Sequence, residues 1–214
     1  MTDIQAVVFD LGGVLIDWDP RYLYRPLFGD DVVGMERFLA EVCSPEWNLT
    51  LDRGRPWSEA VEALSREHPQ HRDHIVAFHE RWAEMLGGPI HDTVAILGEL
   101  RADGVPLYAL SNWSAETFPI AVERYAFLRW FDEIVISGDL GIAKPDRRIF
   151  EHLIGRRSLV PGSTLFIDDM PANVASAEAV GMRALQFHDA NRLRADLVRL
   201  GVLESLATAR ASQD

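Results

Sequence analysis

The sequence predicts an α/β fold in which a Rossmann-like parallel sheet carries a helical cap inserted after its first strand. Three observations predict it: short apolar runs that end on small or acidic residues, helical patterns that alternate with them, and one long aromatic-rich stretch without an apolar strand. Alternating strands and helices are typical of βαβ units, which bind ligands beyond the carboxyl ends of their strands. We therefore expect the functional residues at that edge of the sheet.

The first predicted strand covers residues 4–10, IQAVVFD, and ends on Asp10 before the turn residues Gly12 and Gly13. Three later apolar runs also end on small or acidic polar residues, and they predict strands at 105–111, 133–137 and 163–168. A further run at 183–187 is predicted as an edge strand. Continuous apolar runs are typical of strands covered on both faces, so the sheet is predicted to be parallel.

Helical patterns lie between these runs and predict helices at 93–102, 115–125, 146–157 and 172–180. Gly181 follows the last of them and suits the left-handed conformation that often ends a helix. Residues 18–88 are rich in helix formers and aromatic residues, which predicts a helical cap domain lying over the crevice. The catalytic core then comprises residues 1–17 and 89–214, with the final ARASQD as a frayed tail.

Composition and charge exclude several classes of protein. The 214 residues are 48% hydrophobic and 25% charged, which is typical of a globular chain. Because 21 Lys and Arg face 33 Asp and Glu, the net charge is −12, which disfavours a nucleic-acid partner. No apolar run approaches the roughly 20 residues that span a bilayer. The single cysteine, Cys43, and the lack of a basic segment before the first apolar run favour a cytoplasmic protein. The sequence leaves both a monomer and a dimer open.

Five polar residues stand where a parallel sheet would gather them: Asp10, Ser111, Lys144, Asp168 and Asp169. Carboxylates suit a hard cation such as Mg²⁺, one carboxylate can act as a nucleophile, and an ammonium can face a phosphate. Each residue singly also fits a turn, a helix cap or an exposed surface. Adjacent acids repel each other unless a cation compensates them, so the set points to Mg²⁺-assisted phosphoryl transfer.

Four segments that contain these residues resemble, in order, the four motifs of the haloacid dehalogenase-like hydrolase superfamily: FDLGGVL, LSN, KPD and FIDDMPAN. The resemblance covers the whole chain, and the insertion stands where members with a C1-type cap carry theirs. It implies that Asp10 is a nucleophile that forms an aspartyl-phosphate with a small phosphomonoester substrate. It also implies that Ser111, Asn112 and Lys144 bind the phosphoryl group, and that the peptide bond between Lys144 and Pro145 is cis.

The same resemblance implies a Mg²⁺ site. Asp169 would bind the metal together with Asp10 and the backbone carbonyl of Gly12. Asp168 would support the metal, either as a direct ligand or through its neighbours.

The sequence departs from the phosphatases of the superfamily at Gly12, where most of them carry a second Asp that serves as general acid and base. A missing proton-transfer group ordinarily costs roughly 10²- to 10⁴-fold in rate. Three accounts compete: a substrate with a good leaving group such as a sugar 1-phosphate, an acid and base borrowed from the cap or the flap before it, or lost phosphatase activity. The candidates for a borrowed group are Asp17, Asp19, His79 and Glu80.

The pattern FDLGGVLIDWD and the segment WNLTLDRGRPWSEAVEAL resemble the bacterial glucose-1-phosphatase-like subgroup, in which glycine also replaces the second Asp. This resemblance favours the first account and a sugar phosphate as substrate. Trp18 and Trp113 are predicted to stack on the substrate, and Arg53 is predicted to contact it.

Two other functions stay open at this point. The 2-haloacid dehalogenases of the superfamily also lack the second Asp and use no metal, but their fourth motif is rich in Ser and Asn where this chain has FIDDMPAN. Two acids beside Asp10 without Mg²⁺ would raise its pKa and weaken it as a nucleophile. The other alternative is a catalytically weak, metal-binding regulatory protein, which gives Asp10, Ser111 and Lys144 little reason to coexist.

Overall fold

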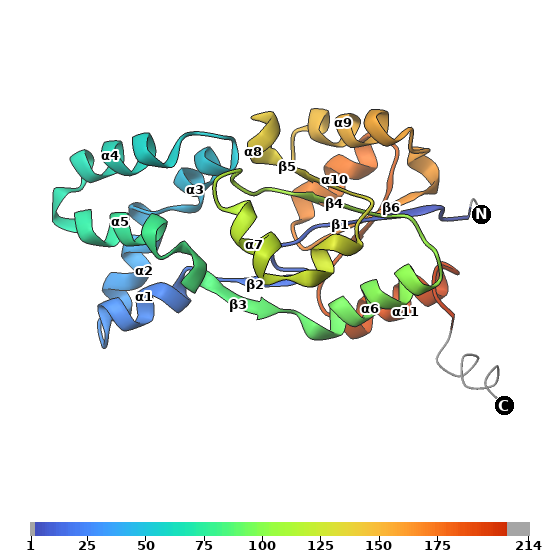
Figure 1. The fold of residues 1–214 in the computed structure, drawn as a ribbon, viewed down its shortest axis with the longest axis horizontal. Coiled ribbons are helices and arrows are strands. Elements are labelled where there is room, and N and C mark those ends of the chain that lie inside the picture. Colours follow the sequence, from blue (N-terminus) through green and yellow to red (C-terminus); the bar gives the residue numbers. More distant parts are fainter. Residues whose placement is uncertain (1–2, 205–214) are drawn as a thin grey trace.

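The computed structural model describes residues 3–204 and contains a five-stranded sheet with strand order β5-β4-β1-β6-β7 (Figure 1). The strands are β1 (Ala6–Phe9), β4 (Leu107–Ser111), β5 (Glu133–Ile136), β6 (Thr164–Asp168) and β7 (Arg183–Gln186). Every pairing within this sheet is parallel, which confirms the predicted α/β fold. The strands are shorter than predicted by a few residues: β1, β4 and β6 begin later, and β1, β5 and β7 end one residue earlier.

β1 lies at the centre of the sheet and is buried along its whole length. Its last residue, Phe9, pairs with Ala109 of β4 and with Ile167 of β6. The polar residues at the ends of these three strands therefore reach the same edge of the sheet.

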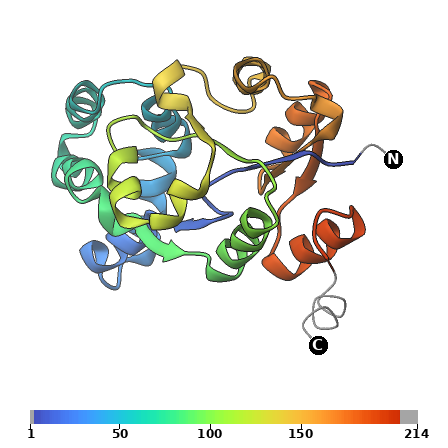
Figure 2. The same cartoon turned by 45° about the vertical axis from the view of Figure 1, so that its right-hand side comes forward.

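The helices of this core are α6 (His91–Ala102), α7 (Phe118–Arg124), α8 (Ser137–Leu140), α9 (Arg147–Arg157), α10 (Pro171–Ala179) and α11 (Ala190–Arg199). They cover both faces of the sheet, and the alternation of side chains along β1 separates two apolar clusters. Val7 and Phe9 pack with α6 and α11, which lie side by side (Figure 2). Ala6 and Val8 point to the other face and pack with α9 and α10.

An antiparallel two-stranded ribbon, β2 (Ile16–Trp18) and β3 (Leu86–Pro89), leads the chain out of the core and back into it. Between its strands lies the helical insertion, residues 21–85, drawn in blue to green at the left of Figure 1. Its α-helices are α1 (Arg21–Phe28), α2 (Val32–Glu41), α3 (Pro45–Asp52), α4 (Trp57–Glu67) and α5 (Arg72–Glu80). The sequence indicated no strand between residues 18 and 88, and β3 corrects this: its sequence, LGGP, has no alternating apolar pattern.

Aromatic rings form much of the core of the insertion. The ring of Tyr24 lies 5.0 Å from that of Phe38 and 6.2 Å from that of Phe78. Trp47 lies 5.3 Å from Phe78 and 6.2 Å from Trp57, in edge-to-face contact with both rings. These distances and orientations are typical of stabilising aromatic pairs, which explains why the segment is rich in aromatic residues.

The predicted helices are present, with small shifts at their ends. The helix predicted at 115–125 begins only at Phe118, because the preceding residues form a turn in which Thr117 and Phe118 donate backbone hydrogen bonds to the carbonyl of Ser114. Gly181 follows α10 at φ +87°, as its position predicted. Two helices, α8 and α11, were not predicted from the sequence. α8 is only one turn long, and α11 lies beyond the last predicted strand.

The predicted frayed tail, ARASQD, lies outside the described residues. Within residues 3–204, no helix has both the length and the apolar character that a transmembrane helix needs.

Candidate active site

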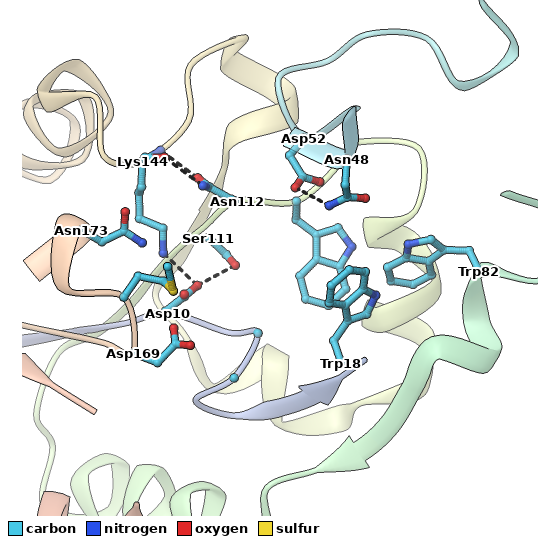
Figure 3. A pocket seen from close by; sticks show the side chains of 14 residues that line it. Asp10, Trp18, Asn48, Asp52, Trp82, Ser111, Asn112, Lys144, Asp169 and Asn173 are labelled. Carbon is cyan, nitrogen blue, oxygen red and sulfur yellow. Dashed lines mark hydrogen bonds and ion pairs between the residues drawn. The ribbon is translucent and has the colours of Figure 1, made fainter. Parts of the chain in front are cut away.

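A cavity of about 280 Å³ lies at the carboxyl edge of the sheet, between the core and the helical insertion (Figure 3). The core lines it with residues at or just after the ends of β1, β4 and β6, with Asn173 of α10 and with Lys144. The ribbon contributes Trp18, and the insertion contributes Asn48, Asp52 and Trp82. A pocket at this position, closed by an inserted element, is where a doubly wound sheet is expected to bind its ligand.

Asp10 follows β1 directly and is the centre of a hydrogen-bonded group. Its Oδ1 accepts hydrogen bonds from the Ser111 hydroxyl at 2.8 Å and from the backbone N–H of Leu11 at 2.7 Å. The Nζ of Lys144 lies 2.9 Å from the same oxygen. Burial raises the pKa of the Asp10 carboxyl, the charge of Lys144 lowers it, and the negative charge of Asp168 raises it further.

Lys144 is fully buried and joins two carboxylates, because its Nζ also lies 2.7 Å from Oδ2 of Asp168. Burial alone would lower the pKa of this ammonium, but the charges of Asp10 and Asp168 outweigh burial, so its pKa is raised and the group is held as a cation. The Lys144–Pro145 peptide bond is cis, as the resemblance implied.

Asn112 lines the cavity, and its side chain hydrogen-bonds to the backbone of Lys144. Its side-chain amide donates to the backbone carbonyl of Lys144 at 3.0 Å, and its Oδ1 accepts from the backbone N–H of Lys144 at 2.8 Å. Both ends of the amide are therefore engaged by the main chain of Lys144. The side chain of Asn112 therefore positions Lys144, and these two hydrogen bonds leave the second N–H of its amide unused.

The two adjacent acids after β6 differ in their surroundings. Oδ1 of Asp168 accepts from the backbone N–H of Met170 at 2.8 Å, and the Asn173 amide lies 3.0 and 3.1 Å from its two oxygens. With Lys144 on Oδ2, both oxygens of Asp168 have protein partners. Asp169 instead lines the cavity, and its pKa is raised by burial and by the charge of Asp168.

The three carboxylates of Asp10, Asp168 and Asp169 each offer an oxygen within 4.8 Å of the others. Among residues 3–204, the ion pairs of these carboxylates are with the single ammonium of Lys144, so three acids stand beside one cation. Oxygen ligands at this spacing and with this charge fit a hard divalent cation such as Mg²⁺.

The two glycines after the first strand differ in how much room surrounds them. Gly13 has φ +73°, and a Cβ there would lie 2.9 Å from Oδ2 of Asp169. At this position both the backbone conformation and the close approach of the carboxylate require glycine. Gly12 lines the cavity, and a Cβ there would meet no atom within 4 Å. The missing side chain at position 12 is therefore not a consequence of crowding.

Of the predicted substrate contacts, Trp18 and Trp113 line the cavity and Arg53 does not. α3 ends at Asp52, and Arg53 follows it as an exposed C-cap residue. Asn48 and Asp52 face the cavity instead, one helical turn apart on the same side of α3. Their four-residue spacing within the WNLTLD segment indicates that two polar side chains share one face of a helix, and this could have been read from the sequence.

The four residues predicted as sources of a borrowed acid lie outside the cavity lining. Asp17 accepts a hydrogen bond from the Tyr22 hydroxyl, and Asp19 accepts one from the backbone N–H of Arg21. His79 stacks on Trp57 at 4.8 Å, and Glu80 is exposed. These four residues lie outside the cavity because of where α1, α5 and the ribbon lie, which the sequence pattern does not specify.

Asp52 is a titratable group of the cavity that was not predicted from the sequence. Its Oδ2 accepts a hydrogen bond from the Asn48 amide at 3.0 Å. Burial raises the pKa of Asp52 to about 7; a backbone hydrogen bond from Ser114 opposes this rise and the charge of Asp10 adds to it.

Comparisons with known proteins agree with this arrangement. A sesquiterpene phosphatase, astK, of Aspergillus oryzae is 29% identical over 189 residues, covering 88% of this chain and 92% of that protein. An (S)-2-haloacid dehalogenase of a Pseudomonas species is 24% identical over 209 residues, covering 90% and 88%. The structure of a HAD-like family hydrolase from Porphyromonas gingivalis superposes with a TM-score of 0.71 at 27% identity, covering 92% of this chain and 97% of that one.

The family description "haloacid dehalogenase-like hydrolase" matches residues 4–181, which include every polar residue of the site described above. The relatives include both a phosphatase and a dehalogenase, so they agree on a hydrolase and differ in the bond that is broken. The chain belongs to the haloacid dehalogenase-like hydrolase family.

Proposed function

We propose that this hydrolase is a Mg²⁺-dependent phosphomonoester hydrolase that acts on a small phosphorylated metabolite, with sugar phosphates as the substrate class. The observation that carries the proposal is the cluster of three carboxylates within 4.8 Å of one another around one buried ammonium. A phosphoryl group brings negative charge into a site. Phosphoryl transfer therefore needs cations that stabilise this charge and a nucleophile that attacks phosphorus.

In this proposal, Asp10 attacks the phosphorus atom and forms an aspartyl-phosphate. All the hydrogen bonds described for its carboxylate meet Oδ1, so Oδ2 is the oxygen that we assign to the attack. Ser111 and Lys144 lie beside it and hold the oxygens of the transferring phosphoryl group. Asn112 acts through Lys144 by holding its backbone.

We assign the Mg²⁺ ligands as Asp10, Asp169 and the backbone carbonyl of Gly12. Asp168 supports this set indirectly, because both of its oxygens already accept hydrogen bonds or an ion pair from the protein. When bound, the metal would neutralise charge on the phosphoryl oxygens and lower the pKa of the Asp10 carboxyl. The chain's own residues supply the nucleophile, the lysine contact and the walls of the cavity.

The substrate class is inferred from the insertion, which we assign as a C1-type cap formed by residues 18–88 over a core of 1–17 and 89–214. Trp18 and Trp82 offer aromatic faces, and Asn48 and Asp52 offer hydrogen-bonding groups. This mixture suits a sugar, which has both apolar faces and hydroxyls, and agrees with the resemblance to glucose-1-phosphatase-like proteins. The Aspergillus relative acts on a sesquiterpene, by its name, so a prenyl phosphate belongs in any substrate panel.

The rival function is dehalogenation, which the Pseudomonas relative supports at 24% identity. The carboxylate cluster argues against it. Without a dication, burial and the charge of Asp168 raise the cost of ionising Asp10, and Asp169 places a third carboxylate in the same cluster. A 2-haloacid would also bring its own carboxylate into this acidic site.

One substrate screen tests the proposal. Phosphate release from sugar phosphates, aryl phosphates and prenyl phosphates is measured with Mg²⁺ and with EDTA, beside halide release from 2-chloropropionate. We expect phosphate release that requires Mg²⁺, that Asp10→Asn reduces by more than about 10³-fold because an amide is a poor nucleophile, and that Asp169→Ala shifts to higher Mg²⁺ concentrations. Halide release in EDTA, or an Asp10→Asn variant within tenfold of the parent, would overturn the proposal.

A further inference from the structure

We propose that Asp52, a residue of the helical insertion, transfers the proton to and from the leaving oxygen in place of the side chain that is missing at Gly12. The inference rests on the proposed phosphatase function and names a further catalytic residue for it. It replaces the expectation that a good leaving group alone makes up for the glycine.

The place of Asp52 in the cavity is the first argument. Asp10 and Asp52 line the same cavity, one from the sheet edge and the other from the end of α3. Figure 3 shows Asp52 entering from the side of the insertion, across the cavity from Asp10 and Asp169. In phosphoryl transfer the nucleophile and the leaving oxygen lie roughly in line on opposite sides of phosphorus. A nucleophile at Asp10 therefore directs the leaving oxygen toward the insertion.

The second argument is that the protein holds this carboxyl in place. The Asn48 amide donates to Oδ2 of Asp52 at 3.0 Å, and the backbone N–H of Ser114 also hydrogen-bonds to the carboxyl. Trp57, just beyond α3, donates from Nε1 to the Ser114 hydroxyl at 2.8 Å, and its backbone N–H donates to Glu116 at 3.0 Å. The end of α3 is thereby attached to the loop that follows Ser111.

The third argument is the protonation behaviour of the group. A proton-transfer residue works best when its pKa lies near the working pH, because both forms are then populated. Burial, together with the charge of Asp10, places the pKa of Asp52 at about 7. The other four carboxyl and imidazole groups considered for this role, those of Asp17, Asp19, His79 and Glu80, do not line the cavity.

The two steps balance with Asp52 in this role. In the first, Asp10 forms a bond to phosphorus, the bond from phosphorus to the ester oxygen breaks, and the proton of the Asp52 carboxyl passes to that oxygen to give the free alcohol. In the second, the Asp52 carboxylate takes a proton from water while the water oxygen attacks phosphorus. The acyl phosphate bond then breaks to release phosphate and regenerate both carboxyl groups in their starting forms.

The test compares the parent with Asp52→Asn across phosphomonoesters of graded leaving-group pKa. Asparagine keeps the shape and can still accept the hydrogen bond from Asn48, but it cannot transfer a proton. We expect a shallow dependence of kcat/KM on leaving-group pKa in the parent. In the variant we expect a steep one, with a loss of about 100-fold or more for alkyl esters and less than about tenfold for 4-nitrophenyl phosphate.

Two further measurements make the test specific to proton transfer. With 4-nitrophenyl phosphate, Asp52→Asn should release a burst of nitrophenol followed by a slow phase, because breakdown of the aspartyl-phosphate also needs the base. Gly12→Asp in the Asp52→Asn background should restore hydrolysis of alkyl esters, since position 12 has room for a Cβ. Glu59→Gln, which replaces an exposed carboxyl on α4, is the matched control and should behave as the parent.

The outcomes separate the assignment of Asp52 from the proposed function. An active parent whose leaving-group dependence is unchanged by Asp52→Asn would overturn the assignment, as would an equal loss for every ester, which indicates a role in substrate binding. If the parent hydrolyses none of the phosphomonoesters, the proposed function is wrong and the assignment falls with it.

Discussion

The fold buries the carboxyl group of Asp52, and burial makes its ionisation unfavourable. In water an aspartate has a pKa near 3.9, whereas burial raises the pKa of Asp52 in the folded protein to about 7. Ionising it at neutral pH therefore costs free energy in the folded state. A group that lowers the stability of the fold is readily explained when it serves the reaction.

This cost makes a prediction about the free energy of unfolding. Between about pH 4 and pH 7 the folded state binds more protons at Asp52 than the unfolded state does, so the contribution of Asp52 to stability falls as the pH rises through this range. Asp52→Asn removes that loss. A pKa difference of about three units corresponds to roughly 4 kcal/mol, so we expect the variant to gain about that much more stability over the parent at pH 8 than at pH 4.

Urea unfolding of both proteins without added metal, at pH 4 and at pH 8, measures the effect. At pH 4 the parent carboxyl is protonated in the folded state and about half protonated in the unfolded state, so the difference between the two proteins should be small. If the difference in free energy of unfolding between Asp52→Asn and the parent is the same at pH 8 as at pH 4, then Asp52 ionises in the folded protein at little cost.

At the scale of single elements, the position of Asp52 depends on how α3 ends. Gly54 stands just after α3 at φ +85°, and a Cβ there would lie 3.0 Å from the backbone carbonyl of Gly138 in α8. The backbone of the loop after α3 thus touches the core directly. The close approach brings the end of α3 to the cavity, and a side chain at position 54 would separate the two.

We expect Gly54→Ala to destabilise the fold by roughly 1–3 kcal/mol and to lower kcat/KM for alkyl phosphate esters, because it strains the backbone and pushes the end of α3 from α8. Gly104→Ala is the matched control. Gly104 has φ +74°, but a Cβ there would meet no atom within 4 Å. It should lose stability through backbone strain alone, with unchanged kinetics. Equal kinetics for the two variants would contradict the role of the close approach.

At the scale of the whole molecule, the core and the insertion share one hydrophobic cluster. It contains Phe9 and Leu165 of the sheet together with Tyr24, Phe38 and Trp57 of the insertion. Apolar contact that continues from one part to the other favours unfolding as a single unit.

We therefore expect one cooperative unfolding transition. Four of the six tryptophans lie in the ribbon and the insertion, so tryptophan fluorescence reports chiefly on that part, while far-ultraviolet circular dichroism reports on the whole chain. The two signals should give the same midpoint in urea, within error, for the parent. Loss of fluorescence at a clearly lower urea concentration would instead indicate an insertion that unfolds independently.

Much of the core was predictable because its signals are local. A strand buried on both faces reads as a continuous apolar run, so the strands ending at Phe9, Ser111 and Asp168 could be located from the sequence. The ribbon strand Leu86–Pro89 could not, because it has only one partner and its two glycines carry no apolar pattern. The true start of α7 depends on a turn at Ser114, which the helical periodicity does not reveal.

The parallel sheet and the group of Asp10, Ser111, Lys144 and Asp169 could be predicted from the sequence, because each of these residues is placed by its own strand or motif. Tertiary structure alone decided that Asp52 faces the cavity, that Arg53 does not, and that position 12 has room for a side chain. The physical reason is that these three facts depend on how the insertion docks on the core. Docking follows from contacts between distant segments, such as Trp57 with Ser114, and these leave no periodic pattern along the chain.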